Sequence, residues 1–171
     1  MWRRIVGFGA AVLATGSLVF SLDSQISQTL VLTISSVGVL GVSGNPRPLI
    51  IESGSEAGDD TTALRYTSAV GRGVRRVIVA QWESGNAAPA GCSLRLTAKP
   101  SRIGPEGSSA GEIVLSEGPQ LLIAGIGSCA TGLQAGEGAR LFYRLRVENP
   151  ALLTSGESKR VTVVFTLMDA S

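Results

Sequence analysis

The feature that most constrains the fold of this 171-residue chain is a two-residue alternation of apolar and polar side chains that recurs along most of its length. The clearest case is the segment 140–148, whose apolar phase consists of Leu141, Tyr143, Leu145 and Val147. A period of two is typical of strands that bury one face and expose the other. We therefore expect β-sheets rather than packed helices.

Further short segments of this kind follow one another after residue 25, separated by turn-forming residues. They lie at 29–34, 37–42, 49–52, 63–69, 76–83, 93–99, 112–116, 120–126, 140–148 and 159–168. Few windows show the 3.6-residue stripe of an amphipathic helix. The sequence predicts an all-β fold, a single antiparallel β-sandwich of the immunoglobulin-like or jelly-roll-like type with about nine or ten strands, formed by residues 25–171.

Residues 1–24 have the pattern of a secretory signal peptide. Arg3 and Arg4 precede the uncharged stretch 5–20, and the small residues Ser21 and Ser24 offer cleavage sites near 21–24. The alternative is an uncleaved membrane anchor, because the apolar stretch approaches the roughly 18 residues that a span needs. We expect a secreted or cell-surface protein, or a periplasmic one, that meets the membrane only transiently through its signal.

Charge and residue usage exclude several functions. The net charge of the whole chain is +2, which Arg3 and Arg4 supply, so the remainder is near neutral and nucleic acid is not an expected partner. The chain has no histidine, which excludes histidine-dependent triads and histidine-ligated metals. We predict no enzymatic activity, no cofactor and no small-molecule substrate, with a paired-carboxylate glycosidase as the open alternative.

The two cysteines, Cys92 and Cys129, would meet an oxidising compartment after export. The sequence therefore predicts one disulfide between them, which would stabilise the fold by roughly 4 kcal/mol on a chain-entropy estimate. The alternative is two buried free thiols.

An acidic segment between residues 52 and 62 could hold a hard cation such as Ca²⁺, which prefers six to eight oxygen ligands. Its candidate ligands are Glu52, Glu56, Asp59 and Asp60. The alternative is a solvated loop in which aspartate and serine side chains make local turn hydrogen bonds.

Five arginines occupy the polar phase of predicted strands: Arg65, Arg95, Arg140, Arg144 and Arg146. If these strands are neighbours, the arginines form a basic stripe suited to phosphate, sulfate or carboxylate groups of a polyanion. The alternative is an ordinary outer face on which Glu83, Glu112 and Glu148 balance the arginines across strands.

The segment 28–42 is apolar and β-branched and contains neither proline nor lysine, the residues that usually block edge pairing. With a signal, one domain, about ten strands and one disulfide, the chain resembles secreted prokaryotic β-sandwich surface subunits, namely fimbrial and spore-coat-U-type subunits and TasA-like filament proteins. The stretches 88–96, 111–115, 141–147 and 161–167 also resemble uncharacterised bacterial secreted proteins. The resemblance implies a structural protein that assembles with itself or with other surface proteins.

We therefore expect a non-enzymatic extracellular structural or interaction protein, a surface or filament subunit that assembles through β-strand edges. In the competing interpretation of the same segment, the strand pairs within its own domain. The alternative function is a monomeric secreted binding module for a polyanionic glycan or cell-surface polymer.

Overall fold

Two antiparallel β-sheets make up nearly all of the regular structure in the computed structural model, which describes residues 35–52, 54–102, 104–132 and 137–170. The larger sheet, sheet A, contains β1 (Val37–Val42), β2 (Glu56–Asp59), β3 (Ala63–Ala69), β5 (Cys92–Lys99), β7 (Ile113–Val114), β9 (Cys129–Ala130) and β10 (Ala139–Val147). The smaller, sheet B, contains β4 (Arg76–Trp82), β6 (Ser108–Ser109), β8 (Gln120–Ile126) and β11 (Val163–Asp169). A 3₁₀ turn, η1 (Pro150–Leu152), follows β10.

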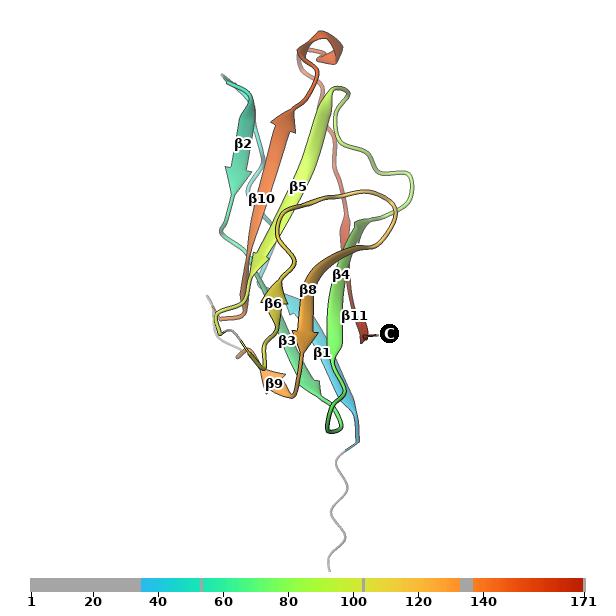
Figure 1. The fold of residues 1–171 in the computed structure, drawn as a ribbon. Coiled ribbons are helices and arrows are strands. Elements are labelled where there is room, and N and C mark those ends of the chain that lie inside the picture. The colour runs from blue at the N-terminus through green and yellow to red at the C-terminus, as the bar shows by residue number, and fades with distance from the viewer. Residues whose placement is uncertain (1–34, 53, 103, 133–136, 171) are drawn as a thin grey trace, which may run out of the picture. The chain divides into compact units, whose positions relative to one another are not determined.

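The strand order places β1 and β11 at sheet edges (Figure 1). Sheet A runs β1-β3-β10-β5-β7, with β2 paired to the far half of β10 and β9 paired to β3. Sheet B runs β11-β4-β8-β6. All strand pairs are antiparallel, and the predicted β-sandwich is confirmed.

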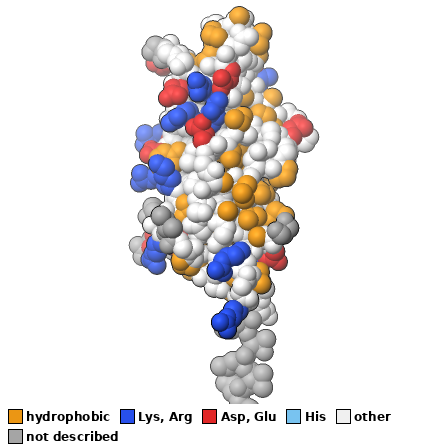
Figure 2. Space-filling view, viewed as in Figure 1, with side chains coloured by type: hydrophobic (Ala, Val, Ile, Leu, Met, Phe, Trp, Pro, Cys, Tyr) orange, Lys and Arg blue, Asp and Glu red, His pale blue; other side chains and the backbone are white. Residues whose placement is uncertain are grey.

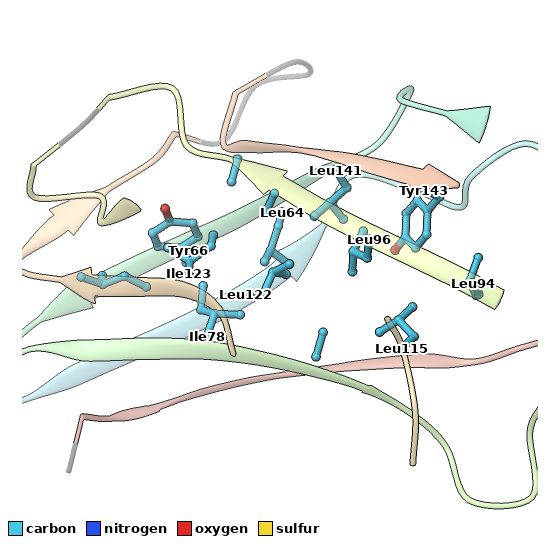
Figure 3. Close-up of a cluster of buried hydrophobic side chains, with 14 residues drawn as sticks. Leu64, Tyr66, Ile78, Leu94, Leu96, Leu115, Leu122, Ile123, Leu141 and Tyr143 are labelled. Atoms are coloured by element: carbon cyan, nitrogen blue, oxygen red, sulfur yellow. The ribbon is translucent and has the colours of Figure 1, made fainter. Parts of the chain in front are cut away.

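The core lies between the two sheets, where the inward phases of the strands meet (Figure 3). Leu64, Leu96 and Leu141 of sheet A face Ile78 and Leu122 of sheet B, and all five are fully buried. The inward phase predicted for segment 140–148 is confirmed, because β10 alternates between inward residues and the exposed arginines. Burying a leucine or isoleucine side chain stabilises the fold by about 1.5–3 kcal/mol each.

Three short strands lie outside the predicted segments, and one predicted strand is wrong. The short strands are β2, β6 and β9. Residues 49–52 form no strand, since Pro46 and Pro48 lack the N–H donors that a ladder needs, and Ile50 is largely exposed.

The predicted signal segment 1–24 and the predicted strand 29–34 lie outside the described residues. Within the described part of the chain, no helix is long and apolar enough to cross a membrane.

Candidate functional site

The two longest edge strands, β1 and β11, lie beside each other on one side of the sandwich. β1 pairs with β3 and β11 pairs with β4, and no other described strand pairs with either of them. Their outer backbone groups can therefore form a ladder with another strand. We call this side of the sandwich the open edge.

β1 is apolar on both of its faces. Val37, Val39 and Val42 are 41%, 58% and 45% exposed, and Leu40 is the only residue of the strand that is even partly buried. An edge strand of this composition has none of the charges or prolines that normally prevent edge-to-edge association. β1 therefore has the properties of a surface that becomes covered.

The other edges of the two sheets differ from the open edge in length. β6 and β7 have two residues each, and β2 has four, two of which are acidic. Very short or charged edge strands are the usual protection against unwanted pairing. Only the open edge combines six- and seven-residue strands with apolar side chains in the described chain.

A groove of about 550 Å³ runs between β1 and β11. Its lining consists of Gly38, Leu40, Arg76, Phe165, Thr166, Leu167, Met168 and Asp169. Leu40, Phe165 and Leu167 are partly buried and pack against the core cluster. An apolar side chain entering the groove would therefore extend the core.

Arg76 closes one end of this groove and connects the two sheets. Its Nε donates to Asp169 Oδ1 at 2.9 Å, and its Nη1 and Nη2 donate to Val37 O at 2.5 Å and Ser36 Oγ at 2.7 Å. The residue is 9% exposed although it is charged. Three charge-assisted hydrogen bonds compensate for removing the guanidinium from water and fix the start of β1 against the end of β11.

Gly38 makes this arrangement possible. A Cβ at position 38 would lie 2.8 Å from Arg76 Nη1 and 3.2 Å from Leu167 Cδ2. Any side chain there would push the guanidinium away from the β1 carbonyl. Arg76 is not among the residues predicted from the sequence, although its position indicates a special role, because this arginine shares the inward phase of its strand with Ile78 and Ala80.

The outer face of sheet A collects the five predicted arginines, on β3, β5 and β10. Arg95 lies directly opposite Arg144. Glu112 lies between them, 2.9 Å from Arg95 Nη1 through Oε1 and 3.5 Å from Arg144 Nη1 through Oε2. Glu148 Oε1 lies 2.8 Å from Arg95 Nη2. The predicted balancing role of Glu112 and Glu148 is thus seen in the geometry, whereas Glu83 lies at the end of β4 in the other sheet.

The acidic segment supplies further counter-ions to the same face. The pairing of β2 with β10 brings Glu56 to 3.9 Å from Arg144, and Asp60 lies 3.7 Å from Arg140. Asp59 is buried and accepts hydrogen bonds from the backbone N–H and Oγ1 of Thr61. These local bonds are those of an Asx-type turn.

Three of the four calcium candidates, Glu56, Asp59 and Asp60, therefore contact different partners. Glu52 lies in an exposed bend before β2, apart from the ion pairs of Glu56 and Asp60. No group of three or more metal-ligating side chains is found among the described residues.

The predicted disulfide is wrong, because both cysteines are free. Cys92 pairs with Val147 at one end of sheet A, and Cys129 pairs with Ser68 beyond the other end of β10. Along the strand direction of sheet A, the two cysteines are therefore roughly twelve residues apart, which is about 40 Å at 3.3 Å per residue. A disulfide requires Cα atoms within about 7 Å.

Comparison of the chain with protein-family models, curated proteins and solved structures found no match. The resemblance to filament and fimbrial subunits therefore stays a prediction.

Proposed function

We propose that the protein is a non-enzymatic extracellular structural subunit that associates with further copies of itself through the open edge. The observation that carries the proposal is the position of two long and mostly apolar edge strands, β1 and β11, beside a groove whose lining includes Leu40, Phe165 and Leu167. Edge strands pair readily with an added strand, whose backbone supplies affinity while alternate side chains fill pockets.

In this proposal, the strand that enters the groove is the segment 28–34 of a neighbouring copy. Its apolar phase consists of Leu30, Leu32 and Ile34, which alternate with residues of the opposite phase. One phase would enter the groove beside Leu40 and Phe165 while the backbone pairs with an open strand. Since the segment directly precedes β1, each copy would carry both a donor strand and an acceptor groove, and such head-to-tail contacts build filaments.

Removing the donor segment tests the proposal. Deletion of residues 25–35 should abolish polymers in electron micrographs and leave a soluble monomer that still unfolds cooperatively. Polymers that persist after the deletion would contradict the proposal. A chain that no longer folds would show that the segment pairs within its own domain.

A matched pair of point variants separates the two phases of the segment. Leu32→Lys places a charge on the phase expected to enter the groove, and Thr33→Lys places the same charge on the opposite phase. We expect Leu32→Lys to prevent assembly and Thr33→Lys to assemble like the unmodified chain. Equal behaviour of the two variants would contradict insertion into the groove.

Polyanion binding on sheet A is the alternative, and the geometry supports it less well. Arg95, Arg140 and Arg144 each have a carboxylate within 4 Å. A polyanion would have to compete with these intramolecular partners. Binding to a sulfated or phosphorylated polymer that falls steeply with ionic strength would support this alternative, and no binding at low salt would exclude it.

A further inference from the structure

The outer face of sheet B carries no charge along its three long strands. Its outward positions are Val77, Val79 and Gln81 on β4, Val164, Thr166 and Met168 on β11, and Leu121 on β8. Val79 lies between Thr166 and Leu121 in a row that crosses the sheet. Leu121, Val164 and Met168 are 44%, 38% and 48% exposed.

The space-filling view shows that hydrophobic and charged side chains gather over different strands (Figure 2). Hydrophobic side chains gather over the region of β4 and β8, whereas lysine, arginine and acidic side chains gather over β2, β5 and β10. When one face of an antiparallel sheet lies in water, the side chains on that face are normally polar. An uncharged apolar outer face therefore indicates a face that another surface covers.

The outward phase of β4 continues into two exposed charges of opposite sign. Arg75 directly precedes the strand and Glu83 directly follows it, both on the phase of Val77 and Val79. Read along β4, this phase begins with a positive charge, continues through apolar residues and ends with a negative charge. Such a row is complementary to a copy of itself that runs in the opposite direction.

We infer that the outer face of sheet B binds the same face of a second copy across a two-fold axis that lies perpendicular to the strands and passes near Val79. This axis stacks β4 on β4 in reverse and brings Arg75 of each copy to Glu83 of the other. A parallel stack would place like charges together instead. A two-fold contact of this kind is self-complementary, as isologous interfaces must be.

The small size of the face limits the strength of the contact. Three strands about 4.8 Å apart and roughly seven residues long cover about 300 Å². Stable interfaces bury about 800 Å² on each partner. The pairwise contact is therefore weak in dilute solution and becomes effective where many copies are held in one array, because linked contacts multiply. It shares β11 with the open edge but uses the outward side chains of β4 and β8 as well, and it needs no added strand.

A charge-swap series tests this inference on exposed residues that leave folding intact. Arg75→Glu alone and Glu83→Arg alone each place like charges across the axis, and the double variant Arg75→Glu/Glu83→Arg restores complementarity. We expect each single variant to self-associate about threefold to tenfold more weakly in sedimentation equilibrium, which corresponds to the loss of two surface ion pairs. The double variant should recover the association of the unmodified chain.

A second variant tests the apolar centre. Leu121→Glu, on β8 opposite Val79 and outside the groove, places two carboxylates near the axis and should weaken association by more than tenfold. The matched control, Val114→Glu, adds the same charge at an exposed apolar position of sheet A and should have no effect. Association that is unchanged in Leu121→Glu, or a chain that stays monomeric up to about 1 mM, would overturn the inference.

The series is run in the unmodified chain and in the Leu32→Lys chain, so that the two contacts are measured apart. If the open edge builds filaments, Leu121→Glu should leave single filaments that no longer associate laterally. If the open edge builds no filaments, the charge-swap variants still test the sheet B contact through the association that remains.

Discussion

The outer faces of the two sheets differ in the side chains that they expose to water. On sheet A, arginines of neighbouring strands are neutralised by carboxylates that come from other segments, such as Glu112 and Asp60. On the outer face of sheet B and at the open edge, the exposed side chains are mainly valine, leucine, methionine and threonine, with Asp169 at the end of β11. A face with satisfied charges is already complete in the monomer, whereas an apolar face gains free energy only when another surface covers it.

This comparison also distinguishes two kinds of arginine. Arg76 lies on the inward phase and holds β1 against β11 with three hydrogen bonds, while Arg140 lies on the outer face with its side chain 64% exposed. The same residue type therefore organises the open edge in one place and neutralises surface charge in the other.

The largest effect is expected from Arg76→Ala. The substitution leaves Val37 O and Ser36 Oγ without their donor and releases β1 from sheet B, so the free energy of unfolding should fall by about 2 kcal/mol. Arg140→Ala is the matched control and should change it by no more than about 0.5 kcal/mol. Urea unfolding measures both, and equal effects would remove the distinction between the two arginines.

A smaller effect is expected from Glu112→Gln on sheet A. The substitution keeps the shape of the side chain but leaves Arg95 and Arg144 directly opposite each other without the carboxylate between them. The melting temperature should decrease at low salt, and the decrease should disappear near 1 M salt, where exposed charges are screened within about 3 Å. A decrease that is independent of salt would mean that Glu112 acts through packing.

The sequence predicted the sandwich and most of its strands because period two is a local signal. Segments 63–69 and 140–148 carry their inward phase in their own residues. By contrast, β2 forms in an acidic segment of low strand propensity because it pairs with β10, more than 80 residues later in the chain. Tertiary pairing of this kind overrides local propensity and leaves no local pattern.

The candidate sites were less predictable than the strands, because they also depend on tertiary pairing. The outward phase of the five arginines followed from alternation, but their partners Glu56 and Asp60 depended on the long-range pairing of β2. The predicted disulfide failed because an even number of cysteines and an oxidising compartment say nothing about the distance between Cys92 and Cys129. The open edge could not be predicted, because it depends on which strands lie at the edges of the sheets. No single segment of the sequence indicates the strand order.

The smallest effect expected on the charged face is a dependence of stability on acidic pH. The hydrogen bond from Ser93 Oγ, followed by that from Arg95, lowers the pKa of Glu148 below its ordinary value of 4.5. A carboxyl whose pKa is lower in the folded state than in the unfolded state binds fewer protons when folded. Its contribution to stability is therefore fully present above pH 4.5 and is lost as the pH falls through the lowered folded value.

Comparing the unmodified chain with Glu148→Gln isolates this contribution. The difference in melting temperature between the two chains should be constant above about pH 5 and should shrink as the pH falls below the ordinary pKa of glutamate. The corresponding comparison for Thr166→Val on sheet B should be independent of pH, because neither side chain titrates and Val79, which lies opposite position 166 on β4, is uncharged. A pH-dependent difference on sheet B, or none on sheet A, would contradict the assignment of charge neutralisation to one face and apolar association to the other.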